Sequence, residues 1–212
     1  MSNQPSSGAV QLSSAIQGGF VGPNAIIQVA HAVNESLGPR CLRRMLKHAH
    51  VTNPLLAPPE GMIDQGSALA LMRTVRSELP AEQAHLIAYD AGRRTADYLL
   101  ENRIPRFAKA ILAGSPERLA TWLLLKAIQR NAWTFAGSGT CTIQGPPTSR
   151  ISIENNPLAM PGCVWHVAVF DRLFQCLVNS DIGFAHTSCC CAGAKSCVFE
   201  LRHGLSSGSA SA

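Results

Sequence analysis

The sequence predicts an α+β fold with a helical N-terminal half, followed by a small, mainly antiparallel sheet packed on helices. Three observations lead to this prediction. Apolar residues recur at helical spacing up to about residue 130, short alternating runs typical of strands follow, and a single further helical stretch interrupts them. Helices first and strands afterwards is the order of an α+β domain, whereas a parallel sheet would need the two in alternation.

Length and composition fit one globular domain between two low-complexity ends. The 212 residues are 46% hydrophobic and 15% charged, which suits a chain that buries one sizeable core. Residues 1–19 are rich in Ser, Gly and Gln, and residues 204–212 consist almost entirely of Ser, Gly and Ala. We therefore predict a flexible N-terminal tail, a single domain over 20–203, and a disordered C-terminal tail.

Charge and hydropathy narrow the classes of partner. The net charge of +5 is modest, and we expect it to be spread along the chain. A protein that binds nucleic acid usually has a dense basic stripe, so we predict no nucleic-acid partner. No apolar run reaches the roughly 18–20 residues of a transmembrane segment. The N-terminus lacks the charged start and apolar stretch of a secretory signal. The protein is therefore predicted to be cytoplasmic, where cysteines stay reduced.

Three helices are predicted in the first 80 residues. Asn24 is a candidate N-cap for the first helix, which ends where Gly38-Pro39 interrupts the apolar pattern. A second helix is predicted over 40–50, with Arg and Lys side chains facing outward. After a Pro-rich loop, a third helix is predicted over 68–77.

Two longer helices follow. The stretch 80–103 starts with a proline, which suits the first turn of a helix, and it ends before Pro105. Ser115-Pro116-Glu117 combines a capping residue, a fixed φ and an acidic side chain near the positive end of the helix dipole. This triplet predicts the start of a helix that continues to Arg130.

The remaining elements form the predicted sheet and one helix packed on it. Ile151 and Ile153 alternate with polar residues, as in a strand with one buried face. Gly145-Pro146-Pro147 marks a turn before that strand. The predicted strands are 133–143, 150–154, 184–188 and 197–202, and the predicted helix is 163–179.

The stretch HTSCCCAGAKSCVFE holds four of the eight cysteines. Disulfides, a metal site, redox thiols and core packing are all open explanations, and an iron–sulfur cluster would need similar thiolates. Structural zinc takes four thiolate or imidazole ligands in a tetrahedron. His186, Cys189 and Cys197 supply three of them around a turn. Cys163 is the best candidate for the fourth ligand, because a helix N-terminus favours thiolate. Cys176 is the alternative fourth ligand.

Three segments carry a resemblance to a known family. GFVGPNAIIQVAHAV, YDAGRRTADYLLENRIP and HTSCCCAGAKSCVFEL resemble the 4-vinyl reductase domain family, over about residues 19–203. The resemblance implies a 4-vinyl reductase domain-like fold. It also implies a role in bacteriochlorophyll biosynthesis, at reduction of the 8-vinyl group (formerly numbered 4) of divinyl protochlorophyllide or chlorophyllide.

The same resemblance implies a structural zinc. Sensor domains of this family hold zinc with an early Cys, an acidic residue and two later Cys. Cys163, Cys189 and Cys197 match the three cysteines, and His186 stands at the acidic position. Imidazole is an equally good zinc ligand, so the resemblance implies a site with altered charge.

Whether the chain is itself a reductase stays open. The sequence shows no dinucleotide-binding fingerprint, phosphate-binding loop, nucleophile elbow or thioredoxin-type Cys pair. A protein that binds or delivers the tetrapyrrole fits equally well, and it would need an apolar pocket with aromatic walls. A magnesium tetrapyrrole would take an axial ligand from His31, with His85 and His166 as alternatives. The candidate pocket walls are Trp122, Trp133, Phe135 and Trp165.

Two other functional classes remain, namely a small-molecule-sensing module and an assembly module of the same fold. A sensor would need an output domain, and no ATPase or DNA-binding segment is apparent. The predicted partners are a protochlorophyllide-type tetrapyrrole and other pigment-biosynthesis enzymes. The fold resembles subunits of a vesicle-tethering complex that dimerise through helices, which implies a homodimer by analogy.

Overall fold

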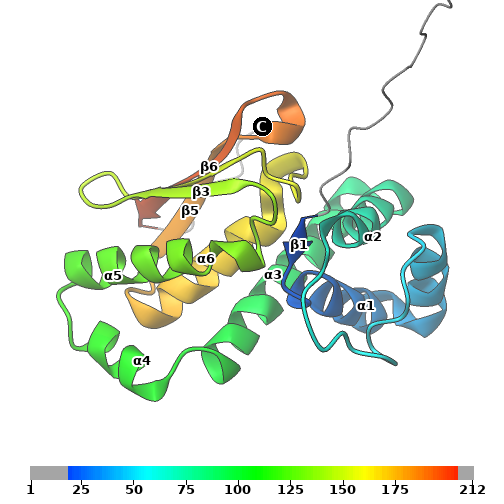
Figure 1. The fold of residues 1–212 in the computed structure, drawn as a ribbon, viewed down its shortest axis with the longest axis horizontal. Helices are drawn as coiled ribbons and strands as arrows, with labels where there is room; N and C mark the ends of the chain where they lie inside the picture. Colours follow the sequence, from blue (N-terminus) through cyan, green and yellow to red (C-terminus); the bar gives the residue numbers. More distant parts are fainter. Residues whose placement is uncertain (1–18, 205–212) are drawn as a thin grey trace, which may run out of the picture.

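Helices and a sheet stack in layers across the molecule (Figure 1). A computed structural model describes residues 19–204, and it has the α+β fold that the sequence predicts. Helix α1 packs on α3, α3 on α6, and α6 on strand β5 of the sheet. Helix α2 covers α1 at one end of the molecule, while α4 and α5 lie at the other. The bounds are α1 (Asn24–His48), α2 (Gln65–Glu78), α3 (Ala81–Asn102), α4 (Arg106–Ala113), α5 (Glu117–Arg130) and α6 (Val164–Leu177).

The main sheet is antiparallel, with strand order β3-β4-β6-β5. Ile151 and Ile153 of β4 are fully buried, as their alternation predicts, and the last two strands form the predicted hairpin. Asp171 of α6 accepts a hydrogen bond from the backbone N–H of Phe184 at 2.6 Å, which fixes α6 to β5. The strands are β3 (Thr140–Gln144), β4 (Arg150–Glu154), β5 (Ile182–Ser188) and β6 (Ser196–His203), and a two-stranded ladder joins β1 (Phe20–Val21) to β2 (Ile63–Asp64).

Several predicted element boundaries were wrong. The strand predicted over 133–143 begins only at residue 140, because Ala132–Thr134 form a short 3₁₀ helix and Gly137, with φ of 53°, lies between that helix and the strand. Helix α2 begins at residue 65 rather than 68, since Asp64 caps it by accepting the N–H of Ser67 at 2.7 Å. The predicted tails, apart from residues 19 and 204, lie outside the described residues.

Helix α4 was not predicted from the sequence. Ser115 follows the end of this helix, and its role differs from the predicted cap of α5. The Ser115 hydroxyl does not cap α5. It donates to the carbonyl of Ile111 at 2.7 Å and so closes the end of α4. Pro116 occupies the N-cap position of α5. Asn24 likewise lies in the first turn of α1, where its Oδ1 accepts a hydrogen bond from Gln28.

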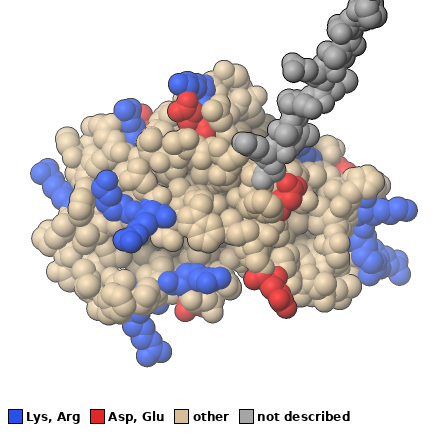
Figure 2. All heavy atoms as spheres, viewed as in Figure 1, with Lys and Arg blue, Asp and Glu red and all other residues tan. Residues whose placement is uncertain are grey.

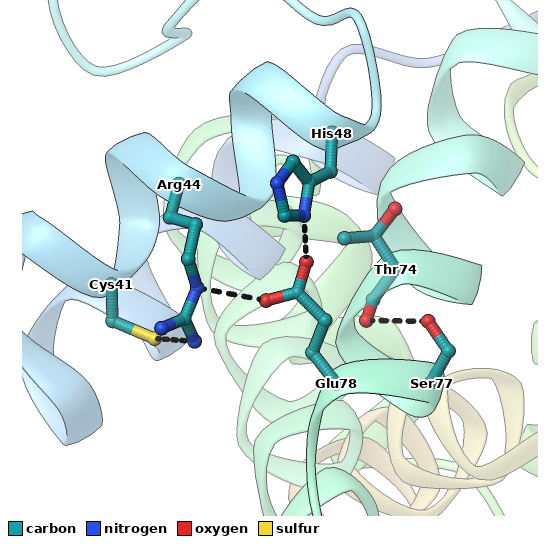
Figure 3. A network of polar contacts seen from close by, with 6 residues as sticks. All are labelled: Cys41, Arg44, His48, Thr74, Ser77 and Glu78. Carbon is teal, nitrogen blue, oxygen red and sulfur yellow. Dashed lines mark hydrogen bonds and ion pairs between the residues drawn. The ribbon is translucent and has the colours of Figure 1, made fainter.

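The two helices predicted on either side of Gly38-Pro39 form α1 with a kink between them. Gly38 adopts φ of 80°, a left-handed conformation that glycine tolerates best. The segment after the kink is fixed to α2 by Glu78, whose carboxylate contacts both Arg44 and His48 (Figure 3). Partial burial raises the pKa of Glu78, but the hydrogen bonds from His48 and Arg44 outweigh it and lower that pKa.

Helices α3 and α6 lie in close contact at Gly92. A Cβ at this position would lie 2.4 Å from the backbone oxygen of Trp165 and 2.7 Å from the Cβ of Ala168. We expect Gly92→Ala to separate the two helices and to lower the free energy of unfolding by about 2–3 kcal/mol. Thermal denaturation should then show a melting temperature lower by roughly 5–10 °C. Gly61→Ala is the matched control, because nothing lies within 4 Å of its added Cβ, and an equal effect of both changes would contradict the prediction.

Candidate metal centre and aromatic interior

Four side chains from three elements converge where α6 begins. Cys163 precedes the first residue of α6, His186 lies on β5, Cys189 follows β5, and Cys197 lies on β6. One ligand atom from each lies within 4.8 Å of the others. The structure therefore brings together the four residues that the sequence analysis selected as metal ligands.

The sulfur separations fit a tetrahedral metal site. The Sγ atom of Cys163 lies 3.7 Å from that of Cys189 and 3.6 Å from that of Cys197, and the last two are 4.0 Å apart. Thiolates bound tetrahedrally to zinc at about 2.3 Å would lie about 3.8 Å from one another. A disulfide needs about 2.05 Å. All eight cysteines are free, so the disulfide explanation does not apply to this structure.

His186 completes the set with an unpartnered nitrogen. Its Nε2 atom is buried and has no hydrogen-bond partner, although buried ring nitrogens are almost always paired. The ring stacks on Phe199 with centroids 5.0 Å apart, which fixes its orientation. A metal ligand role would satisfy this nitrogen.

The three thiols influence one another strongly. The pKa of Cys197 is lowered to about 4, mainly because Cys163 donates a hydrogen bond to its sulfur; burial opposes this, and the N–H of Cys190, 3.3 Å away, adds to it. Donation to Cys197 and burial raise the pKa of Cys163, and burial raises that of Cys189 to about 11. The contacts within the cluster thus favour the thiolate form at Cys197 and the thiol form at Cys163 and Cys189. A divalent metal would favour thiolate at all three positions.

The backbone before α6 is arranged to present Cys163. Gly162 adopts φ of 74° and Cys163 adopts φ of 42°, so two consecutive residues are left-handed. A non-glycine residue in this region costs on the order of 1 kcal/mol or more, and such strain concentrates at functional sites. The turn buries the Cys163 thiol beside the two strands instead of leaving it on the helix surface.

The other cysteines lie outside this cluster. Cys176, the competitor for the fourth position, is exposed on α6, and Cys191 is exposed although its sulfur lies 3.1 Å from that of Cys189. Asn156 is a member of the site that the sequence analysis missed. It is buried, it accepts the N–H of Leu158 at 3.0 Å, and it contributes to lowering the pKa of Cys197. A single Asn in a loop carries no sequence signal for such a role.

A second group of aromatic side chains fills the space between α6 and the sheet. His166 lies within it, 99% buried, with ring centroids 5.7 Å from Phe199 and 6.3 Å from both Phe135 and Phe170. Neither ring nitrogen of His166 has a hydrogen-bond partner, and neither has the buried Nε1 of Trp165. Burial lowers the pKa of His166 to about 4, so the ring is neutral and one nitrogen carries a free lone pair.

The residues predicted to line a pigment pocket are only partly brought together. Phe135 packs edge-on against His166, and Trp165 is buried beside it. Trp122 and Trp133 are 44% and 56% exposed, and His31 is half-buried on α1. Two hollows of about 310 and 300 Å³ are lined by other residues, near α5 and near the start of α1. The five-residue pocket stays a prediction.

No helix among residues 19–204 combines the length and apolar character that a bilayer-spanning segment requires.

Known structures share this fold. The chain resembles an H-NOX protein from S. oneidensis with a TM-score of 0.59 and 10% identity, covering 86% of this chain and 99% of that one. It resembles an H-NOX protein from K. algicida with a TM-score of 0.59 and 8% identity, covering 88% and 98%. The protein is therefore an α+β domain of the H-NOX fold, with a Cys₃His cluster that could hold a metal ion.

Sequence relatives define the family. The chain is 38% identical over 188 residues to the bacteriochlorophyll synthase 23 kDa chain of Cereibacter sphaeroides, covering 85% of this chain and 89% of the relative. It is 36% identical over 186 residues to the protein of the same name from Rhodobacter capsulatus, covering 85% and 86%. No protein-family model matches the chain. The chain belongs to the bacteriochlorophyll synthase 23 kDa chain family, a family of bacteriochlorophyll biosynthesis proteins.

Proposed function

We propose that the chain binds a divinyl protochlorophyllide- or chlorophyllide-type tetrapyrrole and presents it for reduction of its 8-vinyl group, which is the role that its resemblance to the bacteriochlorophyll biosynthesis protein BchJ implies. The observation that carries the proposal is the 38% identity to a bacteriochlorophyll synthase chain across 85% of the sequence. Binding and presentation are the part of this role that the side chains support best.

The aromatic interior supports tetrapyrrole binding. Ligand sites are mostly apolar, with a few polar groups that fix orientation. Phe135 and Trp165 supply aromatic surface, while the unpartnered nitrogens of His166 and Trp165 supply a lone pair and a donor. The neutral imidazole of His166 is the form that coordinates a metal centre. A further solved structure of this fold, with a TM-score of 0.55, comes from work on heme distortion in the H-NOX family.

The proposal assigns a secondary part in pigment binding to His31, Trp122 and Trp133. All three side chains are half-buried or exposed, so each is accessible to a ligand at the surface. His31 is the alternative axial ligand, and substitution distinguishes it from His166, as described in the Discussion.

The metal in the Cys₃His cluster is proposed to be zinc with a structural role. Three thiolates and one imidazole form a closed tetrahedral set, which leaves no position for a substrate or water. The ligands join the start of α6 to both strands of the last hairpin. Zinc at this point would therefore stabilise the docking of the hairpin on α6.

Reduction itself is proposed to need a partner. The predicted partners are other pigment-biosynthesis enzymes, among them a separate reductase that supplies the hydride, and the predicted assembly is a homodimer. The discriminating experiment begins with titration of the purified protein by divinyl protochlorophyllide. We expect a shifted pigment absorbance and quenched tryptophan fluorescence, with haem as a comparison tetrapyrrole.

A second step separates a carrier from an enzyme. NADPH is added with and without a separate 8-vinyl reductase, and the monovinyl product is measured by chromatography. Product formed faster only when both proteins are present supports the proposal. Product from this chain alone would show that it is a reductase, and absence of any spectral change would contradict pigment binding.

A further inference from the structure

Helices α4 and α5 expose an unusual amount of apolar surface. They follow one another through a three-residue link and lie together at one end of the molecule (Figure 1). Eight large apolar side chains are exposed among the described residues, and four of these lie on these two helices, which total 22 residues. The four are Phe107 (69% exposed), Ile111 (55%), Leu119 (46%) and Trp122 (44%).

These side chains lie on the outer faces of their helices. Phe107 and Ile111 are four residues apart on α4, on the side away from the buried Leu112. On α5, Leu119 and Trp122 continue into Lys126 and Arg130 at spacings of three and four. The opposite side of α5 is the buried one, formed by Ala120, Thr121, Leu124, Leu125 and Ile128. Neither outer face is part of the core.

The net charge of the protein lies in these two helices and the end of α3 before them. Residues 103–130 contain six of the 18 Lys and Arg residues and one of the 13 acidic residues, a net charge of +5. The rest of the chain holds twelve of each sign and is neutral. The charge is therefore concentrated here, contrary to the expectation that it is spread along the chain. The six cations are Arg103, Arg106, Lys109, Arg118, Lys126 and Arg130.

These cations have no acidic partners in the described part of the chain. The ion pairs found there involve other basic residues, and Glu117, the one acid of the segment, lies 3.5 Å from His203 instead. Lys109 donates to the carbonyl of Leu100, and the side chain of Lys126 reaches Gln129. Figure 2 shows Lys and Arg side chains over the α4 and α5 end of the molecule, with few acidic side chains between them. We call this surface, formed by the four apolar and six basic residues, the α4–α5 surface.

We propose that the α4–α5 surface binds the surface of an anionic lipid bilayer. Apolar side chains between cations match the two layers of such a surface, because the apolar groups enter the acyl boundary while the cations meet lipid phosphates. A Trp with its polar ring nitrogen suits that boundary in particular. The attachment is peripheral, and its test uses substitutions that leave Trp122 unchanged.

Other occupants fit less well. A symmetric contact with a second copy would place the same cationic surface against itself, and like charges would repel. A nucleic acid would meet the cations, but it would leave exposed aliphatic side chains such as Ile111 and Leu119 without a partner. An anionic bilayer accommodates both kinds of group.

Vesicle co-sedimentation tests the proposal with two variants of the full chain. The charge variant is Arg106→Gln/Lys126→Gln/Arg130→Gln, matched by Arg43→Gln/Arg73→Gln/Arg76→Gln, whose arginines are exposed on α1 and α2. The apolar variant is Phe107→Ser/Leu119→Ser, matched by Leu56→Ser/Leu86→Ser, which are exposed elsewhere. Melting temperatures and circular dichroism confirm that all four variants fold.

We expect binding to vesicles with 30% phosphatidylglycerol and little binding to pure phosphatidylcholine. The charge variant should bind about 100-fold more weakly, which is about 3 kcal/mol for three cations. The apolar variant should also lose binding, and both control variants should keep it. The proposal would be overturned by equal binding to neutral vesicles or by equal losses in the control variants. It would also be overturned if the protein bound no vesicles and instead formed a dimer or a nucleic-acid complex that the apolar variant abolishes.

Discussion

Purified protein should contain about one zinc per chain, and Cys189→Ala should remove it and loosen the C-terminal hairpin. The reason is that Cys189 joins the hairpin loop to Cys163 at the start of α6, with sulfurs 3.7 Å apart. Structural zinc contributes roughly 10–16 kcal/mol of binding free energy in small zinc peptides, so the loss of even part of it is large. We expect the melting temperature to fall by about 10 °C or more.

The matched control is Cys191→Ala. Its sulfur lies only 3.1 Å from that of Cys189, yet it is exposed and outside the four-residue cluster. This variant should keep the metal and most of the stability, and so should Cys176→Ala on α6. Metal content is measured by elemental analysis and stability by thermal denaturation. Metal-free protein of equal stability would contradict a structural role for the metal.

His166→Leu should make the unliganded protein more stable and at the same time weaken its binding of pigment. Each buried polar group without a partner costs about 1–3 kcal/mol, and His166 has two unpartnered nitrogens. Leucine removes that cost at similar volume, so the melting temperature should rise by about 4 °C or more. A residue with a purely structural role would not combine a gain in stability with a loss of binding.

The two other candidate axial ligands, His85 and His31, are tested in the same way. We expect titration with divinyl protochlorophyllide to give an affinity at least tenfold lower for His166→Leu, while His85→Leu, at an exposed position, leaves it unchanged. His31→Leu distinguishes the alternative axial ligand. Loss of binding in His31→Leu with full binding in His166→Leu would return the ligand role to His31 and refute the role of His166.

The clustering of the four candidate metal ligands could be predicted because most of them are close in sequence. His186, Cys189 and Cys197 belong to one hairpin, so their spacing alone brings them near each other. Cys163 was selected because it stands at the predicted start of the preceding helix, where a thiolate is favoured, and the family resemblance pointed to the same residue. The contribution of Asn156 arises from the loop after β4, and no local pattern encodes it.

The positions of the aromatic side chains could not be predicted from the sequence. Trp133 and Phe135 lie in a segment that looks like a strand, but Trp133 belongs to a short 3₁₀ helix, Ala132–Thr134, and Phe135 is the residue that ends it. Trp122 and Leu119 repeat at helical spacing as core residues do, yet they face solvent. Periodicity identifies a face of a helix, and only the tertiary arrangement decides which face is buried. The eight-residue α4 was missed because its single buried side chain, Leu112, gives no repeat.

Helix α6 connects the candidate metal site to the candidate pigment ligand, so binding at one can affect binding at the other. Cys163 precedes its first turn, and His166 follows one turn later on the same rigid element. If a pigment ligand at His166 and a cation at Cys163 each restrict this turn, the free energy by which one strengthens the other must be reciprocal. At equilibrium with a chelator, pigment-saturated protein should then retain more of its metal than the empty protein does, although the two ligands need never touch.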